Sequence, residues 1–376
     1  MPKGREKINR PFLFLTILLA VGGFFIFSSA SLGILAQNPL KFSSVAFSQL
    51  FLGLFLGSIA CLLTARIDYH IWKKFSIFIF IFSILITLLV FIPQLSLPHG
   101  GANRWIDLGV ITFQPSELLK LGFIIYFAAW GSAFKQKIGT FNWGLLPFII
   151  LVSIVGVVLL AQPDTDTFAV IVFSALAMYL SAGAKWKHIL TILIFGVVCL
   201  AGLAFMRPYV MQRITSMLKP AENTLTTSYQ LRQSLIAVGS GGVWGRGFGQ
   251  SVQKFAYLPE PVGDSVFAVA AEEFGFVGGS AIMLTFVLFG LYGLKIASGA
   301  PDEFGRLLSI GIVILIVSQA FVNIGGMIGV LPLTGIPLPF ISHGGTALFI
   351  TLVEAGIVMN ISRYSKQIRP LKNKEN

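Results

Sequence analysis

Long apolar runs recur along the whole chain, and no other feature limits the possible fold as strongly. A helix needs about 20 predominantly apolar residues to cross a bilayer, and runs of that size follow one another from residue 12 to residue 362. The chain of 376 residues is 55% hydrophobic and only 11% charged, whereas soluble domains carry about 25% charged residues. The pattern predicts an all-α polytopic membrane protein, and it excludes a disordered chain and an ordinary soluble enzyme.

Breaks rich in charged or turn-forming residues divide these runs into ten predicted transmembrane helices. The helices are expected near residues 12–36, 43–65, 75–96, 114–133, 142–162, 166–183, 188–206, 265–295, 307–331 and 338–362. The two cysteines, Cys61 and Cys199, lie inside apolar runs, so neither a disulfide nor a metal site is expected. No internal repeat and no soluble domain stands out, and residues 1–376 are interpreted as one integral membrane domain.

The distribution of Lys and Arg predicts the topology, because cytoplasmic loops carry an excess of these residues. With the N-terminus inside, most of the 27 Lys and Arg residues fall in cytoplasmic segments, including the N-terminus 1–11 and the basic tail 363–376. Only Lys41 and Arg104 fall in short outer loops. Both termini are then cytoplasmic, and residues 207–264 form one long extracytoplasmic loop between helices seven and eight. The net charge of +12 follows from this rule, and no nucleic-acid binding is inferred.

Two charged residues lie at the start of the fourth predicted helix. Pro115 and Glu117 are typical of a helix start, since Pro suits the first turn and an acid suits the positive end of the helix dipole. Glu117 and Lys120 then lie one turn apart on the same face, at a depth where charges are costly and by default mark a site. Two interpretations are open, a structural ion pair and a polar cavity that opens to the outside.

The long outer loop contains a glycine-rich stretch. Six glycines among the eleven residues 239–249 would let backbone N–H groups approach a ligand closely, and consecutive N–H groups form anion-binding concavities. Arg246 and Lys254 add positive charge. The stretch is a candidate cradle for a phosphate or pyrophosphate, and a flexible turn is the alternative. Residues 229–238, just before it, are expected to form a short interfacial helix.

Three acids lie around the start of the eighth predicted helix. Asp264 stands where the outer loop enters the helix, and it suits either an N-cap or a general base whose pKa is raised by desolvation. Glu272 and Glu273 lie two turns into an apolar helix, so they would need internal partners or protonation. His343, in the Pro- and Gly-rich outer turn where the tenth helix is expected to begin, is interpreted as a hydrogen-bonded structural residue rather than a catalytic one.

Short motifs in a fixed order extend over residues 95–360. They are Arg104-Trp105-Ile106, Gln114-Pro115-Ser116-Glu117 with Lys120, Gln162-Pro163-Asp164, the Gly-Arg-Gly-Phe-Gly-Gln loop at 245–250, Leu258-Pro259-Glu260 with Asp264, Glu272-Glu273-Phe274-Gly275, Gly329-Val330-Leu331-Pro332 and Pro339-Phe340-Ile341-Ser342. This order and spacing resemble the SEDS family, whose members include FtsW, RodA and SpoVE. The resemblance implies ten spans, in agreement with the number of apolar runs.

The resemblance implies a peptidoglycan glycosyltransferase that polymerises lipid II at the outer face of the bacterial cytoplasmic membrane. It implies that Asp264 is the essential acid and that Glu117 and Lys120 line the same cavity. Asp264 would deprotonate the acceptor's GlcNAc 4-hydroxyl, which attacks MurNAc C1 of the donor and releases undecaprenyl pyrophosphate. Lys120, Arg246 and Arg104 are the candidates for stabilising that leaving group.

A divalent cation, Mg or Mn, could share the task of stabilising the pyrophosphate, and no metal ligand is assigned. The substrate-binding residues expected from the matched motifs and the outer loop are Arg104, Trp105, Gln114, Ser116, Gln233, Arg246, Lys254, Glu260 and Ser342.

Three positions depart from the family pattern. Gly263-Asp264-Ser265 replaces the usual Thr-Asp-Phe, and His343 stands where Tyr is commoner. Asp166 stands where the Gln-Pro-Asp motif generally continues to a glycine. All three departures leave the essential acid in place.

Residues 253–261 resemble the division branch, FtsW, more than the elongation branch, RodA. The division branch implies septal synthesis, with a class B penicillin-binding protein as the transpeptidase partner, other divisome proteins and membrane lipids as contacts, and enrichment at the division septum. The alternatives are a lipid II flippase, an elongation-type polymerase that controls cell shape, and a non-catalytic scaffold. Intramembrane charges cluster towards the outer half of the membrane, with Glu354 as the exception, and this favours chemistry over flipping.

Overall fold

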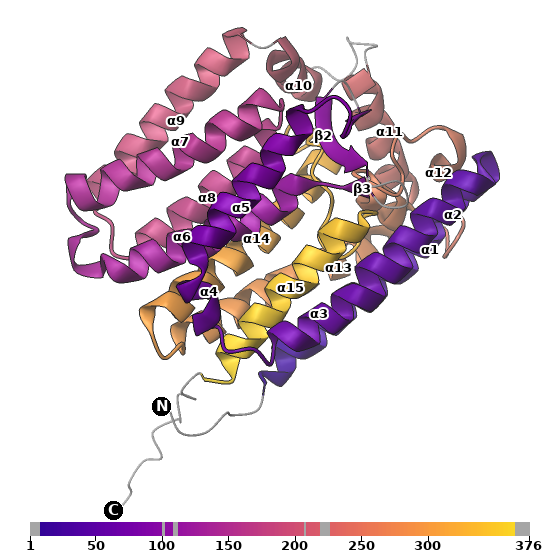
Figure 1. Ribbon diagram of the computed structural model, residues 1–376. Helices are drawn as coiled ribbons and strands as arrows, with labels where there is room; N and C mark the ends of the chain where they lie inside the picture. The colour runs from indigo at the N-terminus through magenta and orange to yellow at the C-terminus, as the bar shows by residue number, and fades with distance from the viewer. Residues whose placement is uncertain (1–7, 100–101, 108–111, 207, 219–225, 365–376) are drawn as a thin grey trace, which may run out of the picture.

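The computed structural model describes residues 8–99, 102–107, 112–206, 208–218 and 226–364. The outer parts of the two predicted cytoplasmic ends, 1–7 and 365–376, lie outside the described residues. The chain folds into a bundle of helices that run roughly along a common direction (Figure 1). The start of the first helix lies beside the end of the last helix, where the Asn9 N–H donates to Ser362 Oγ at 3.1 Å. This agrees with the expectation that both termini lie on one side.

Helix occupies each of the ten predicted spans. The helices of the first half are α1 (Arg10–Gln37), α2 (Pro39–Phe47), η1 (Ser48–Leu56), α3 (Gly57–Thr64), α4 (His70–Lys74), α5 (Ser76–Leu88), η2 (Leu89–Phe91), α6 (Pro115–Ala133), η3 (Lys135–Lys137), η4 (Phe141–Leu145) and α7 (Leu146–Ala161). Those of the second half are α8 (Thr165–Ser181), α9 (Trp186–Met206), α10 (Pro208–Leu218), α11 (Thr226–Ser240), α12 (Gln253–Ala256), α13 (Val266–Ser298), α14 (Glu303–Met327) and α15 (Gly345–Ser362).

Six helical stretches among the described residues are long and apolar enough to cross a membrane. They are Arg10–Gln37, Phe42–Thr64, Phe141–Ala161, Val266–Ser298, Glu303–Met327 and Gly345–Ser362. Three further apolar helices are shorter, Ser76–Phe91, Thr165–Ser181 and Trp186–Cys199. Helix α6 is the remaining predicted span, and it carries a charged pair in its first turns. The protein is a helical membrane protein, and the total of ten spans stays a prediction.

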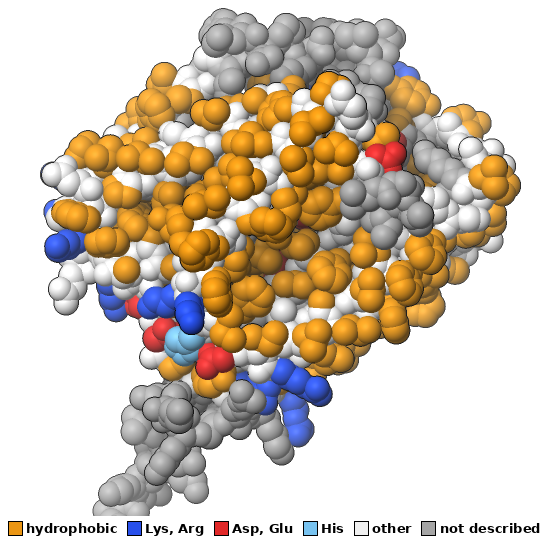
Figure 2. All heavy atoms as spheres, viewed as in Figure 1, with side chains coloured by type: hydrophobic (Ala, Val, Ile, Leu, Met, Phe, Trp, Pro, Cys, Tyr) orange, Lys and Arg blue, Asp and Glu red, His pale blue; other side chains and the backbone are white. Residues whose placement is uncertain are grey.

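The last two long helices form the centre of the bundle. Helix α14 packs against α6, α8, α13 and α15, while α15 packs against α3 and η1. Every residue of α15 except Phe349 is buried. A close approach of α15 to α3 depends on Gly356, where a Cβ would lie 2.1 Å from Thr64 Oγ1. By contrast, the face of the molecule in Figure 2 is covered by hydrophobic side chains, as expected of a surface that contacts lipid.

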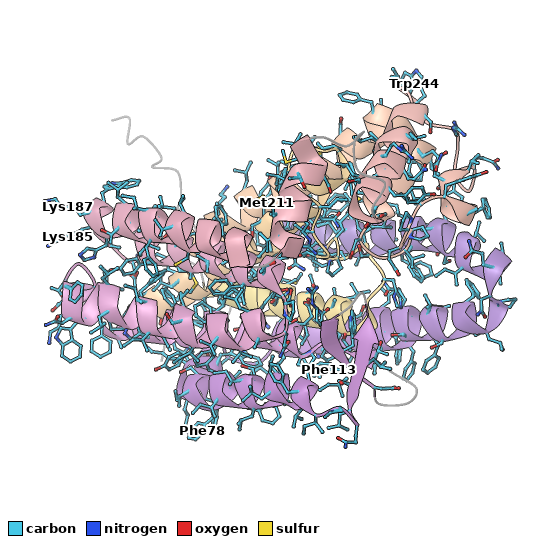
Figure 3. All side chains as sticks on the ribbon, turned by 90° about the horizontal axis from the view of Figure 1, so that it is seen from above. Phe78, Phe113, Lys185, Lys187, Met211 and Trp244 are labelled. Atoms are coloured by element: carbon cyan, nitrogen blue, oxygen red, sulfur yellow. The ribbon has the colours of Figure 1, made fainter. Side chains whose placement is uncertain are left out.

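The loops that are predicted to be cytoplasmic contact one another at one end of the bundle. Lys135 Nζ lies 2.8 Å from Glu303 Oε2, and the Tyr69 hydroxyl donates to Asp302 Oδ1 at 2.7 Å. Lys185 and Lys187 lie at one end of the molecule and Trp244 of the long loop lies towards the other (Figure 3). The two sets of loops are therefore separated as the topology requires, and the membrane side of each end stays a prediction.

The expectation of an all-α chain needs one correction, because residues 96–113 contain a small antiparallel sheet. It has the strand order β1 (Ser96–His99), β2 (Ala102–Asp107), β3 (Thr112–Phe113). Leu97 pairs with Trp105 and Pro98 pairs with Asn103, so the register shifts at Arg104. A bulge of this kind bends a strand and re-aims a side chain, and such short strands lie below the length that an apolar-run analysis detects.

The long outer segment is also more ordered than a loop. Helices α10, α11 and α12 lie within 207–264, and α11 extends the interfacial helix that was expected at 229–238. Helix α13 covers the span predicted at 265–295, and Gly275 breaks it with φ 67° and ψ −164°. The final span begins at Gly345 rather than 338, because the Pro- and Gly-rich residues before it do not form a helix.

Candidate functional site

Asp264 lies on the turn that leads into α13, and its backbone is held from two sides. The Asn323 side chain of α14 donates to the Asp264 carbonyl oxygen at 2.8 Å and to the Ile336 carbonyl oxygen at 2.8 Å. Ser342 Oγ donates to the Gly263 carbonyl oxygen at 2.7 Å. The N-cap of α13 is Ser265, which corrects the alternative that Asp264 caps this helix. None of the described side chains donates a hydrogen bond to the Asp264 carboxylate.

The Asp264 carboxylate shares a small space with the Arg104 guanidinium, above Gly335. A Cβ atom added to Gly335 would lie 3.6 Å from Asp264 Oδ2 and 3.8 Å from Arg104 Nη1. Gly335 belongs to the irregular segment 328–344 between α14 and α15. One acid and one cation from segments about 160 residues apart in sequence therefore lie near the same point.

The bulge in β2 and the start of α8 position the Arg104 side chain. Its guanidinium donates to the Gln162 carbonyl oxygen at 3.4 Å and to the Pro163 carbonyl oxygen, and Nη1 lies 3.9 Å from Asp164 Oδ1. Asp164 is the N-cap of α8. The motifs at 104–106 and 162–164 are thus in direct contact, through the Arg104 side chain.

Charge and burial act together on the Asp264 carboxyl. Burial raises the pKa of Asp264 to about 7, and the negative charges of Glu260 and Asp166 contribute to the rise, while Arg104 and Arg213 oppose it. Asp264 nevertheless keeps part of its surface exposed. A carboxyl that titrates near neutral pH and reaches solvent suits a general base, because the best catalytic pKa lies near the working pH.

Glu117 and Lys120 form the structural ion pair that was one of the two interpretations. Lys120 Nζ donates to Glu117 Oε1 at 2.8 Å and to Gln319 Oε1 of α14 at 3.0 Å, and both charged side chains are buried. Gln319 Nε2 donates in turn to the Pro337 carbonyl oxygen at 3.4 Å. Since Asn323 lies one turn further along α14, this helix links the pair to the segment that carries Gly335.

Glu354 of α15 is close to the same pair. It interacts electrostatically with Lys120 and Glu117, and its Oε1 is buried without a hydrogen-bond partner among the described residues. The expectation placed Glu354 apart from the other intramembrane charges, on the inner side. The structure instead assembles Glu117, Lys120 and Glu354 into one group.

The glycine-rich stretch and the residues just after it donate their N–H groups to Glu272 and Glu273 of α13, so they do not form an open phosphate site. The N–H groups of Arg246 and Gly247 donate to the carbonyl oxygens of Glu272 and Glu273 at 3.0 and 2.9 Å. The N–H of Ser251 donates to the Glu273 carboxylate at 3.3 Å. The next two residues, Val252 and Gln253, donate their N–H groups to the Glu272 carboxylate at 3.1 and 3.3 Å. The expected phosphate cradle is thus corrected, since backbone carbonyl oxygens accept from its N–H groups at 245–247, and the carboxylates of Glu272 and Glu273 accept from the N–H groups just after it.

The glycines in this stretch permit a close approach of two backbones. A Cβ on Gly245, whose φ is +81°, would lie 2.1 Å from the Glu273 carbonyl oxygen, and a Cβ on Gly275 would lie 2.3 Å from the Gly245 nitrogen. Where Gly275 breaks α13, the Phe276 and Val277 N–H groups donate to the Gly242 and Val243 carbonyl oxygens at 2.8 and 3.1 Å. The break therefore leaves these backbone donors satisfied.

Lys254 completes this second group of charges. Its Nζ donates to Glu273 Oε1 at 2.7 Å, to Ser29 Oγ at 3.0 Å and to the Gly249 carbonyl oxygen at 2.9 Å, and its side chain is 0% exposed. Arg246 Nη1 lies 3.4 Å from Glu272 Oε1. The expectation that Lys254 binds substrate is corrected for this conformation, because the ammonium is sealed inside the protein.

The remaining predicted substrate-binding residues take different places. Gln114 and Ser116 are buried at the start of α6, where Gln114 Oε1 and Ser116 Oγ have no hydrogen-bond partner among the described residues. Trp105 lies on β2 opposite Leu97. On α11, Gln230 rather than Gln233 reaches the turn at Asp264, as its Nε2 donates to Ser265 Oγ at 3.0 Å.

Glu260 and Ser342, both predicted to bind substrate, form hydrogen bonds with the backbone of the turn that carries Asp264. Glu260 is exposed with φ 45°, and its carbonyl oxygen accepts from the N–H groups of Gly263 and Ser265 at 3.1 and 3.2 Å. Ser342 is buried beside Gly263. His343 stacks on Phe27, with 6.1 Å between the ring centroids, in agreement with a structural role.

Sequence reasoning missed two residues beside Asp264 as members of the site. Asp166 binds Arg213 of α10, with Nη1 at 2.7 Å from Oδ1 and 2.5 Å from Oδ2, and it accepts from the Gly335 N–H at 3.2 Å. The departure from glycine at position 166 was a signal for Asp166. No sequence signal distinguishes Arg213 from the other cations of the long outer segment.

The acids around Asp264 do not form a ready metal site. No group of three or more His, Cys, Asp or Glu side chains among the described residues is arranged to hold a metal ion. Asp164 and Asp166 each face a guanidinium instead, at 3.9 Å and 2.5 Å.

Comparison with known proteins identifies relatives along almost the whole chain. Residues 10–367 match the family model of the FtsW/RodA/SpoVE cell cycle proteins. The chain is 37% identical over 350 residues to stage V sporulation protein E of Bacillus subtilis (strain 168), over 93% of this chain and 95% of the relative. It is 38% identical over 310 residues to a probable peptidoglycan glycosyltransferase FtsW of Geobacter sp. (strain M18), over 82% of this chain and 84% of the relative.

Two solved structures share the fold. One is a chain of a peptidoglycan synthase complex in which polymerization and crosslinking are structurally coordinated, with a TM-score of 0.78 and 25% identity over 96% of this chain and 99% of that chain. The other is the rod shape determining protein RodA of Thermus thermophilus, with a TM-score of 0.68 and 25% identity over 96% of this chain and 98% of that chain. This chain therefore belongs to the FtsW/RodA/SpoVE family, which is the SEDS family that its motifs resemble.

Proposed function

We propose that the protein is a peptidoglycan glycosyltransferase that polymerises lipid II at the outer face of the bacterial cytoplasmic membrane. Family membership supports the reaction class, and relatives at 35–38% identity carry the name peptidoglycan glycosyltransferase FtsW with the qualifier probable. The observation that carries the proposal is the Asp264 carboxylate, which has a pKa of about 7 and faces one space with Arg104 above Gly335.

In the proposed reaction Asp264 acts as the general base. Its carboxylate takes the proton of the acceptor's GlcNAc 4-hydroxyl while that oxygen forms a bond to MurNAc C1 of the donor. The bond between C1 and the pyrophosphate oxygen breaks, and the electron pair leaves with undecaprenyl pyrophosphate. The new glycosidic bond has the inverted configuration at C1, because the acceptor attacks the face opposite to the leaving group. Proton transfer of this kind contributes about 10²- to 10⁴-fold to a rate.

Among the candidate cations, Arg104 best fits the stabilisation of the leaving pyrophosphate. Lys120 and Lys254 are buried in ion pairs, and Arg246 faces Glu272 in the second charge group. Arg104 keeps 19% of its side-chain surface exposed and faces the same space as Asp264. A guanidinium binds phosphate oxygens in a bidentate manner, and it is aligned in advance by the carbonyl oxygens at 162 and 163.

The test is polymerisation of purified lipid II by the reconstituted protein, as wild type and as Asp264→Asn. We expect glycan polymer from the wild type and a loss of at least about 100-fold in the variant, because a general base is removed. Asp68→Asn is a matched control, since Asp68 is an exposed acid that precedes α4, and α5 separates α4 from the sheet (Figure 1). A class B penicillin-binding protein is added in a parallel reaction.

Each alternative has its own outcome in this assay. Equal polymerisation by wild type and Asp264→Asn would rule out Asp264 as the base. No polymer from the wild type, even with the penicillin-binding protein present, would favour a lipid II flippase or a scaffold.

We further propose a role in septal synthesis, with a class B penicillin-binding protein as the partner. Support for the division branch comes from the motif at 253–261 and from relatives named FtsW, while support for a synthase partner comes from the similar chain in a peptidoglycan synthase complex. Septal enrichment of the fluorescently tagged protein, with failure of division on its depletion, is the expected result. Lateral localisation with loss of cell shape would favour the elongation branch instead.

A further inference from the structure

Asp166 is a contact point for segments that are far apart in the sequence. Its carboxylate accepts two hydrogen bonds from Arg213 Nη1, at 2.7 and 2.5 Å, and one from the Gly335 N–H, at 3.2 Å. The side chains of Asp166 and Arg213 are 11% and 21% exposed. One carboxylate thus joins the start of α8, helix α10 and the segment 328–344.

Among the described residues, helix α10 and segment 328–344 have few other features that would hold them against the start of α8. Segment 328–344 has no regular secondary structure, and it carries Gly335, to which the Asp264 carboxylate and the Arg104 guanidinium both lie close. Helix α10 (Figure 3, at Met211) follows α9 within the outer segment and packs mainly against α9 and α11. Hydrogen bonds to a charged acceptor are about twice as strong as neutral ones, so Asp166 is well suited to hold both segments.

The same arrangement places charges around Asp264 from every neighbouring element. Negative charge comes from Glu260 on its own turn and Asp166 on α8, and positive charge comes from Arg104 on β2 and Arg213 on α10. Asp166 acts to raise the pKa of Asp264, and Arg213 acts to lower it. Neutralising one member of the Asp166–Arg213 pair therefore shifts this pKa in one direction, and neutralising the other shifts it in the opposite direction.

We propose that Asp166 is a positioning residue for the Asp264 site, and that its simultaneous bonds to Arg213 and to the Gly335 N–H fasten α10 and segment 328–344 to the start of α8. This inference rests on the proposed function, because it assigns Asp166 a role relative to the general base. Asp166 touches neither base nor substrate in the proposal, and it acts through the segments that it holds.

The first test does not depend on activity. Amide hydrogen exchange of the full-length protein in nanodiscs is compared for wild type, Asp166→Asn and Asp68→Asn, in peptides that cover 208–218 and 331–337. We expect faster exchange in both peptides for Asp166→Asn, including the Gly335 N–H that loses its charged acceptor, and wild-type exchange for Asp68→Asn. Unchanged exchange in Asp166→Asn would overturn the proposal, and so would an increase spread evenly over α4 and α15, since that indicates general destabilisation.

The second test uses the pH dependence of lipid II polymerisation. We expect the acidic limb of the rate profile to move to lower pH in Asp166→Asn and to higher pH in Arg213→Gln, each by about one pH unit. Asp166→Glu keeps the negative charge and should retain the wild-type limb. Shifts in the same direction for both neutral variants would overturn the electrostatic part. Faster local exchange in a protein without any polymerase activity would support the fastening and contradict the proposed function.

Discussion

Asp264 and the pair Glu272 and Glu273 lie only eight residues apart around the start of α13, and their surroundings differ completely. Glu272 and Glu273 are 0% and 1% exposed, and backbone N–H groups, Ser29, Ser251 and Lys254 donate to their oxygens. Asp264 keeps some exposure and receives no hydrogen bond from a described side chain. Buried charges persist only with partners, so the pair Glu272 and Glu273 stabilises the fold.

The contrast shows how one helix start can supply both structure and chemistry. A carboxylate whose lone pairs are filled by donors is a poor base, because its charge is already stabilised. Asp264 has like-charged neighbours and a pKa of about 7, so its carboxylate gains from taking up a proton. Environments that separate the properties of nearby carboxyl groups are typical of catalytic sites.

The largest effect that would sharpen this comparison is expected from Lys254→Met. Removing the ammonium leaves Glu273 buried without its counter-ion, which costs about 3–5 kcal/mol. The melting temperature of the purified protein should fall strongly in Lys254→Met and recover in the double variant with Glu273→Met, where an apolar pair replaces the ionic one. Asp264→Asn should leave the melting temperature unchanged or higher. A melting temperature for Lys254→Met equal to that of wild type would contradict the structural role of this group.

A second effect concerns pH. In the proposed mechanism the carboxylate form of Asp264 is the base, so polymerisation should fall about tenfold per pH unit below pH 7 and level off above it. For stability the sign is opposite. The pKa of Asp264 is raised from 3.8 to about 7, so its favourable contribution is complete below pH 4 and is lost as the pH rises through 7. An acidic limb near pH 4 in the rate profile would contradict this prediction, because it would show that the base titrates like an ordinary carboxyl group.

The smallest effect is expected at Gly335. A methyl group there would touch Asp264 Oδ2 and Arg104 Nη1 at 3.6 and 3.8 Å, which are ordinary contact distances. Gly335→Ala should therefore fold normally and slow polymerisation several-fold, since it occupies the space that the reacting groups need. Gly239→Ala is the matched control, as nothing lies within 4 Å of its added Cβ. Equal rates for both variants would show that substrate does not use the space above Gly335.

Much of the fold could be predicted because its main signals are local. Apolar runs and flanking Lys and Arg residues located helix in every predicted span, and the pairing of Glu117 with Lys120 followed from a spacing of three residues on a helix. The sheet at 96–113 was missed because its strands are short and carry few apolar residues. The break at Gly275 was missed because its cause is the backbone of Gly245, thirty residues earlier.

The candidate site was predicted in part. Its acid, its arginine and the buried Glu–Lys pair came from motifs in the sequence, and so did the suspicion that position 166 is unusual. The contact of Asp166 with Arg213 could not be foreseen, since it joins residues 47 positions apart, at the start of α8 and in α10, with the whole of α9 between them. The glycine-rich stretch was assigned to an external anion, because sequence shows the N–H donors and not which acceptor they meet.

The sequence by itself determined the class of the protein, a polytopic helical membrane protein of the SEDS family, and it indicated Asp264 as the candidate acid of the site. These follow from hydrophobicity, charge and short motifs, which act over one or two helical turns. Only the tertiary structure decided that Glu272 and Glu273 find internal partners, while Asp264 and Arg104 both lie close to Gly335. The properties of a carboxyl group depend on which donors and charges lie within a few ångströms of it, and packing brings those groups together from distant parts of the chain.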